Sequence, residues 1–90
     1  ISKNNDKNNN YLGEYYKASN YTLNNKPYYI HVKKHSFIGW NSRKWILTGT
    51  QWLIDIVKTQ SNTFGGFYSN TNFTQNIIDT TWDHFNIQKI

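Results

Sequence analysis

Short segments rich in aromatic and β-branched residues recur along the chain after residue 10, and turn-forming residues separate them. The clearest covers residues 27–33, where Tyr28, Ile30 and Val32 alternate with Tyr29, His31 and Lys33. Because successive side chains of a strand point to opposite faces, this alternation predicts a strand with two distinct faces. Residues 11–17 and 64–69 predict two more strands. Gly65-Gly66 in the latter indicates a bulge or a close approach of backbones.

Residues 37–40 and 44–47 flank the turn sequence Asn41-Ser42-Arg43, so they predict a tight hairpin. The next segment, residues 51–57, is open to two interpretations. Its alternating Trp52, Ile54 and Ile56 favour a strand, since these residue types suit a pleated surface, but a buried helix also fits.

Near the end of the chain, Ile78, Trp82 and Phe85 have helical spacing and predict one short helix near residues 74–80, while residues 80–85 also suit a last strand. Strands about 8–12 residues apart with short links are typical of all-β proteins. We therefore expect an antiparallel meander of six to seven strands, curled into a small barrel or sandwich.

The chain of 90 residues is long enough for one domain. Residues 1–10, ISKNNDKNNN, have no apolar periodicity and predict a disordered Asn/Lys-rich linker or tail. Residues 11–90 then form a single β-rich module. Because the chain begins with Ile1 rather than Met, we expect the module to be excised from a larger protein.

Aromatic residues make up 18% of the chain and must supply most of the core, because all apolar residues together reach only 37%. We expect Trp45 and Trp82 to be buried. No apolar stretch is long enough to span a membrane. The absence of cysteine excludes disulfides and thiolate zinc sites, and favours a cytoplasmic or inner-membrane-associated protein.

The net charge of +5 raises the prospect of an anionic partner. However, Asn, Lys, Ile, Tyr and Phe make up half of the residues, and this composition resembles malaria-parasite proteins. The lysine excess then reflects composition rather than a binding surface.

Six short motifs follow one another in a recognisable order: Gly13-x-Tyr15, Asn25-Lys26-Pro27-x-Tyr29, Phe37-Ile38-x-Trp40, Trp45-x-Leu47, Tyr68-Ser69 and a final Trp82. This order resembles a loosely defined β-rich module that is rich in Trp and Tyr and lacks cysteine. The resemblance implies an accessory domain of a large secreted or membrane-associated protein. It implies no chemistry and transfers no functional residue.

Catalytic and metal-binding constellations are absent from the sequence pattern. The adjacent Asp83 and His84 would point to opposite faces of a strand, which argues against acid–base catalysis. His31 and His35 flank two lysines, which would repel a metal ion. No nucleophile elbow or phosphate-binding loop occurs. We therefore predict no enzyme, no cofactor and no metal.

Two binding functions remain as alternatives to protein interaction. Exposed aromatic rings and many Asn side chains would suit a carbohydrate-binding, adhesive module. Basic residues beside aromatic ones (Lys33, Lys34, Arg43, Lys44) resemble a single-stranded nucleic-acid surface, which we consider the less favoured alternative because no base-stacking strand has the right spacing.

The sequence thus predicts a non-catalytic protein-interaction or scaffold module, whose partner is another protein or a neighbouring domain of the parent chain. The candidate binding surface consists of Tyr28, Tyr29, His31, Lys33, Lys34, Phe67 and Tyr68.

Overall fold

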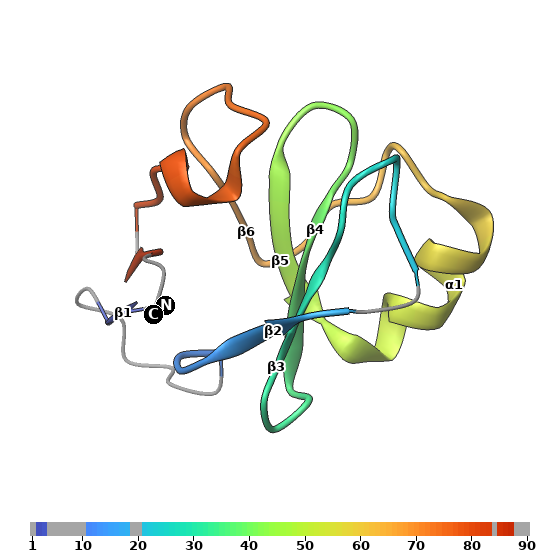
Figure 1. Ribbon diagram of the computed structural model, residues 1–90, viewed down its shortest axis with the longest axis horizontal. Coiled ribbons are helices and arrows are strands. Elements are labelled where there is room, and N and C mark those ends of the chain that lie inside the picture. The colour runs from blue at the N-terminus through green and yellow to red at the C-terminus, as the bar shows by residue number, and fades with distance from the viewer. Residues whose placement is uncertain (1, 4–10, 19–20, 84, 88–90) are drawn as a thin grey trace.

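Five short strands form one antiparallel sheet in the computed structural model, which describes residues 2–3, 11–18, 21–83 and 85–87 (Figure 1). The strands are β2 (Tyr15–Lys17), β3 (Tyr29–His31), β4 (Ser36–Trp40), β5 (Trp45–Gly49) and β6 (Tyr68–Ser69). Each pairs with the next along the chain, so the predicted antiparallel meander is confirmed. Among the described residues no ladder joins β2 to β6, and closure into a barrel or sandwich stays a prediction.

The β4–β5 hairpin forms where the turn sequence predicted it. Its register pairs Trp40 with Trp45, leaving residues 41–44 as the loop. The Asn41 side chain holds this loop, because its Oδ1 accepts hydrogen bonds from Arg43 N at 3.0 Å and Lys44 N at 2.8 Å. Ser42 adopts a φ of 75°, so the turn also places one non-glycine residue in the left-handed region.

A helix replaces the strand favoured for residues 51–57, and that interpretation was wrong. Thr50–Trp52 forms the 3₁₀ turn η1 and Leu53–Thr59 forms the helix α1. Three side chains at helical spacing, Leu53, Ile56 and Val57, pack against the sheet, whereas Ile54 is 78% exposed. The apparent alternation of Ile54 with Ile56 therefore does not mark a common face.

The predicted short helix near residues 74–80 is a single 3₁₀ turn, η2 (Ile77–Asp79), capped by the Asn76 side chain. A second, two-stranded sheet pairs β1 (Ser2–Lys3) with β7 (Phe85–Asn86). Two residues of the predicted tail are thus in a ladder, which uses backbone groups and needs no apolar side chain. The remaining tail residues, 1 and 4–10, lie outside the described part of the chain.

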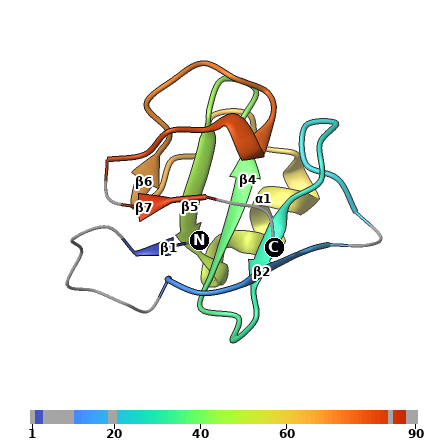
Figure 2. The same cartoon turned by 60° about the vertical axis from the view of Figure 1, so that its left-hand side comes forward.

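Other segments pack against both faces of the five-stranded sheet, with α1 on one face and the segment that ends in β7 on the other (Figures 1 and 2). One cluster joins alternate residues of β4 and β5 to the N-terminal segment and the segment that ends in β7; it consists of Tyr11, Ile38, Trp40, Trp45, Leu47, Trp82 and Phe85. Trp45 and Trp82 are buried, which confirms that prediction.

The opposite face packs against α1 and the segment before β3. Its buried cluster consists of Leu23, Tyr28, Phe37, Ile46, Ile56 and Phe64. Gly39 of β4 permits this packing, since a Cβ there would lie 2.8 Å from Leu23 Cδ2. The sheet is therefore a central layer, with a helix on one side and the described parts of the terminal segments, including β7, on the other.

Candidate functional site

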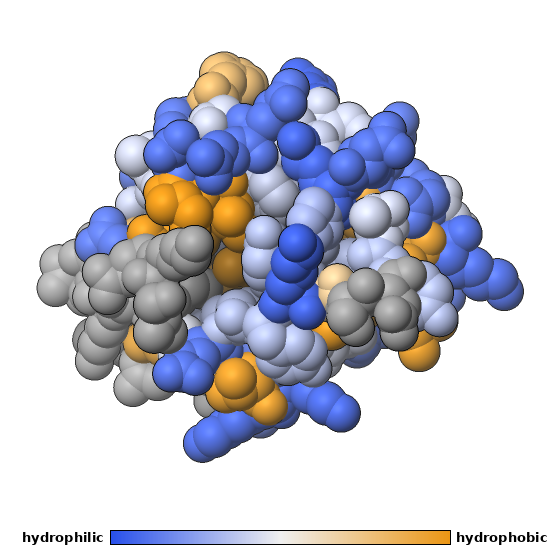
Figure 3. All heavy atoms as spheres, viewed as in Figure 1, coloured by the Kyte–Doolittle hydropathy of each residue, from blue (hydrophilic) through white to orange (hydrophobic). Residues whose placement is uncertain are grey.

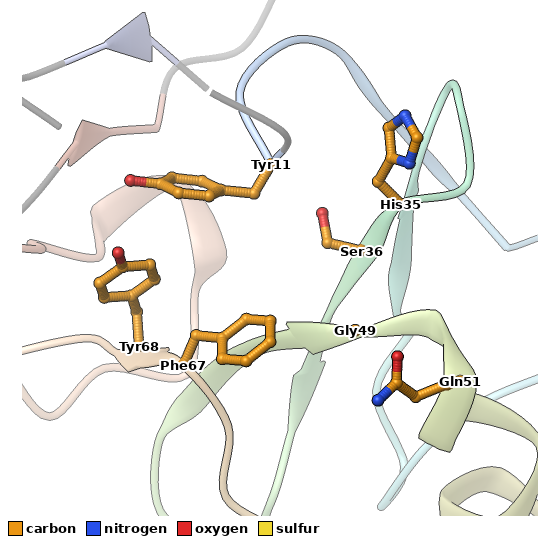
Figure 4. Close-up of a pocket in the computed structure, with 7 residues that line it drawn as sticks. All are labelled: Tyr11, His35, Ser36, Gly49, Gln51, Phe67 and Tyr68. Carbon is orange, nitrogen blue, oxygen red and sulfur yellow. The ribbon is translucent and has the colours of Figure 1, made fainter. Parts of the chain in front are cut away.

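A pocket of about 430 Å³ opens beside the first residues of β4 and the last residue of β5 (Figure 4). We call it the Phe67 pocket; its lining residues are Tyr11, His35, Ser36, Gly49, Gln51, Phe67 and Tyr68. Aromatic rings from Tyr11, Phe67 and Tyr68 form one side in Figure 4, and His35, Ser36 and Gln51 lie on the other. The pocket thus joins an apolar wall to a polar wall.

Phe67 stands at the mouth of this pocket with 67% of its surface exposed. Its backbone is nevertheless fixed, because Phe67 N donates to Leu47 O at 3.0 Å. The preceding Gly66 lets the chain run this close to β5: a Cβ there would lie 2.4 Å from Thr48 Cβ and 2.7 Å from Leu47 O. The close backbone approach predicted for Gly65-Gly66 is confirmed at Gly66.

The inner part of the aromatic wall is anchored in the core. The Tyr68 ring lies 5.1 Å from the Tyr11 ring and 5.9 Å from the Phe85 ring, between centroids. Tyr68 is half-buried, and Tyr11 is buried. Of the three residues that form the aromatic wall, Phe67 is therefore the most exposed.

The Ser36 hydroxyl, which is buried in the lining of the pocket, is already engaged in a hydrogen bond. Tyr15 donates its hydroxyl hydrogen to Tyr11 O at 2.6 Å, so its contact with Ser36 Oγ requires the serine hydroxyl to be the donor. Burial raises the pKa of Tyr15 to about 12, although the hydrogen bond from Ser36 acts in the opposite direction. Ser36 is buried and engaged, which leaves His35 and Gln51 as the exposed polar side chains of the lining.

His31, which the sequence placed on the binding surface, is instead a buried structural residue. Its Nε2 lies 2.6 Å from Leu12 O, and its Nδ1 accepts a hydrogen bond from Lys33 N at 2.9 Å. A carbonyl oxygen only accepts, so Nε2 carries the hydrogen and the tautomer is fixed. Gly13 makes room for this ring: its φ is 126°, and a Cβ there would lie 3.1 Å from His31 Nε2.

The other predicted surface residues divide between core and solvent. Tyr28 is buried against Phe37, with ring centroids 6.4 Å apart, and Tyr29 packs on Trp45 at 6.3 Å. Lys33 and Lys34 are exposed in the turn that precedes His35. Lys34 O accepts a hydrogen bond from Thr50 Oγ1 at 2.7 Å, which ties this turn to the end of β5. Of the predicted set, only Phe67 and Tyr68 line the pocket.

Five lining residues were missed by sequence reasoning, namely Tyr11, His35, Ser36, Gly49 and Gln51. Tyr11 stands at the boundary of the predicted tail, and Gln51 begins the segment interpreted as a strand. Neither position carries a local signal, since the pocket is assembled by tertiary packing of four separate segments.

The basic residues considered for nucleic acid separate in space. Lys33 and Lys34 precede β4, whereas Arg43 and Lys44 follow it. Five strand residues at about 3.3 Å each put roughly 16 Å between the two pairs. They do not form one continuous basic surface along this strand.

Among the described residues, no group of three or more His, Cys, Asp and Glu could hold a metal ion. No helix in the described part of the chain has the length and apolar character needed to cross a membrane. No protein-family model matches the chain, and no curated protein or solved structure is significantly similar to it.

Proposed function

We propose that the chain is a non-catalytic interaction module that binds another protein, or a neighbouring domain of a longer parent chain, through the Phe67 pocket. One observation carries this proposal: a large aromatic side chain is exposed although the backbone around it is held rigidly. Rigid exposed aromatic residues beside a pocket are typical anchors of protein interfaces, because their burial costs little side-chain entropy.

Two hollows lined by Phe67 also suit a small interface. On the face of the molecule that Figure 3 draws, apolar groups lie in separate patches on a mostly hydrophilic surface. Phe67 and Tyr68 line a second hollow of about 200 Å³ as well, formed with Ser69, Trp82, Asp83 and Phe85. A partner could therefore place one side chain on each side of the Phe67 ring.

Carbohydrate binding is the alternative that the polar wall supports. Gln51 and His35 are exposed and could donate to sugar hydroxyls, while Phe67 could stack on a sugar ring. Against this alternative, Phe67 is the one largely exposed ring of the aromatic wall on which a sugar could stack. Nucleic acid is the least favoured partner, because the basic residues lie at opposite ends of β4.

The test begins with peptides selected from a random displayed library for binding to the wild-type chain. The affinity of each selected peptide is then measured for the wild type and for its variants. Peptide binding should weaken about 30-fold or more in Phe67→Ala, the loss expected for an interface anchor of about 2 kcal/mol. The matched control is Tyr21→Ala, which removes another exposed aromatic ring outside the pocket. Both variants should unfold at the same urea concentration as wild type, since both rings are largely exposed.

Equal peptide binding by wild type and Phe67→Ala would refute the proposal. A panel of neutral oligosaccharides serves as the second arm. Saturable sugar binding that disappears in Phe67→Ala, without any Phe67-dependent peptide, would favour the carbohydrate alternative instead.

A further inference from the structure

A third hollow lies at the other end of β4, between the β4–β5 turn and the loop that follows β6. It measures about 360 Å³ and is lined by Trp40, Ser42, Arg43, Phe73, Thr74 and Gln75. We call it the hairpin-tip site. It shares no lining residue with the Phe67 pocket.

Hydrogen bonds hold both walls of this site in place. On the hairpin side, Asn41 bonds the turn and also donates from Nδ2 to Phe64 O at 3.0 Å. On the loop side, Asn72 Nδ2 donates to Asp79 O at 2.9 Å, and Asn72 Oδ1 accepts from Thr81 N at 2.9 Å. Phe73 is 81% exposed, yet it stands next to this closed loop base. The site is therefore preorganised.

Three basic side chains, those of Lys26, Arg43 and Lys44, lie around the hairpin-tip site. Lys44 Nζ lies 5.2 Å from the centre of the Phe73 ring, and Lys26 Nζ lies 5.7 Å from that of Trp40. Arg43 lines the hollow and is exposed. Within the described part of the chain, no carboxylate forms an ion pair with any of these three cations.

We propose that the hairpin-tip site binds an acidic peptide segment in which a carboxylate side chain stands next to an apolar one. The Arg43 guanidinium suits a carboxylate, because its planar N–H donors pair with both oxygens at once. The exposed Phe73 ring receives the neighbouring apolar side chain. Ser42, Thr74 and Gln75 supply polar groups for the peptide backbone.

An acidic peptide fits this site better than a nucleic-acid strand. Single-stranded nucleic acids are held by a series of stacking rings along a basic track. Trp40 is buried, so Phe73 is the one exposed aromatic ring among the residues that line the site, and it cannot form a series by itself. The exposed Lys33 and Lys34 lie at the far end of β4 and do not extend the basic charge of this site.

The experiment titrates the whole chain with two terminally capped peptides. In the first peptide, glutamates flank a leucine; in the second, glutamines replace those glutamates. Backbone amide shifts in NMR titrations locate binding and give the dissociation constant. The glutamate peptide should shift residues 41–44 and 73–75, and should bind at least tenfold more tightly than the glutamine peptide. Arg43→Gln should weaken the glutamate peptide about tenfold. The turn survives this change, because Asn41 bonds the backbone N–H of residue 43.

Lys58→Gln is the matched control, since it removes one exposed positive charge on α1. Equal weakening by Lys58→Gln and Arg43→Gln would show attraction by net charge alone and overturn the proposal. Equal binding of the two peptides would also overturn the proposal. The same holds if a thymidine oligonucleotide shifts the same amides at a lower concentration than the glutamate peptide does. Phe67→Ala should leave the titration unchanged, which separates this result from the test of the Phe67 pocket.

Discussion

The Tyr15 side chain connects the N-terminal segment to β3 and to the start of β4. It bonds Tyr11 O in the N-terminal segment and Ser36 at the start of β4, while its ring packs edge-on against His31 at 5.2 Å. Burial favours the neutral phenol, and the pKa is accordingly raised to about 12. The raised pKa of Tyr15 therefore links the stability of the fold to alkaline pH.

The sign of that sensitivity follows from linkage. An unfolded tyrosine has a pKa of about 10, so the unfolded chain loses the Tyr15 proton before the folded chain does. The stabilisation is complete below pH 10 and is lost as the pH rises from about 10 to about 12. We expect the free energy of unfolding, measured with urea across this range, to fall more steeply for wild type than for Tyr15→Phe. Parallel curves for the two proteins would contradict the role of Tyr15.

Helix α1 offers a direct test of the element that the sequence left open. In a strand, residues 54 and 56 would share a face; in α1, Ile56 is buried and Ile54 is exposed. Ile56→Ala should therefore cost about 2–5 kcal/mol of unfolding free energy, the usual range for a buried isoleucine. Ile54→Ala should change it by less than about 0.5 kcal/mol. Similar losses for both variants in urea titrations would point back to the strand.

The elements that the sequence predicted well are those with local signals. Asn41-Ser42-Arg43 specifies the β4–β5 hairpin through the Asn41 side chain, which bonds backbone within the turn itself. Residues 51–57 lack such a signal, because the spacing of their apolar residues suits both a strand and a helix. The packing of Leu53, Ile56 and Val57 on the sheet favours the helix.

The candidate site was predicted only in part for a related reason. Tyr28 and Tyr29 have the composition of an interface, but here both faces of the sheet are covered, so the neighbouring tyrosines enter opposite clusters. Phe67 stays exposed because Gly66 allows the backbone to lie directly against β5, which leaves the Phe67 ring on the outside of this contact. Sequence alone could suggest that these aromatic residues matter. It could not say which of them stay exposed.

At the scale of the whole molecule, aromatic stacking joins the end of the chain to the central sheet. Phe85 is fully buried, stacks on Trp82 with centroids 4.8 Å apart, and touches the rings of Tyr11 and Tyr68. Its strand β7 also carries the ladder to β1. The described residues 11–12, 82, 85 and 87 of the terminal segments therefore pack in the core on one face of the sheet.

Removal of the Phe85 ring tests this architecture. Phe85→Ala should cost about 3–5 kcal/mol, a large share of the roughly 5–15 kcal/mol that stabilises a typical domain. Phe73→Ala removes the same ring from an exposed position and should leave the unfolding midpoint within experimental error. Urea titrations followed by tryptophan fluorescence and by far-ultraviolet circular dichroism should give coincident transitions for each protein. If Phe85→Ala instead retained wild-type stability, the terminal segments would fold separately from the sheet, and the Phe67 pocket, one wall of which is Tyr11, would lose its support.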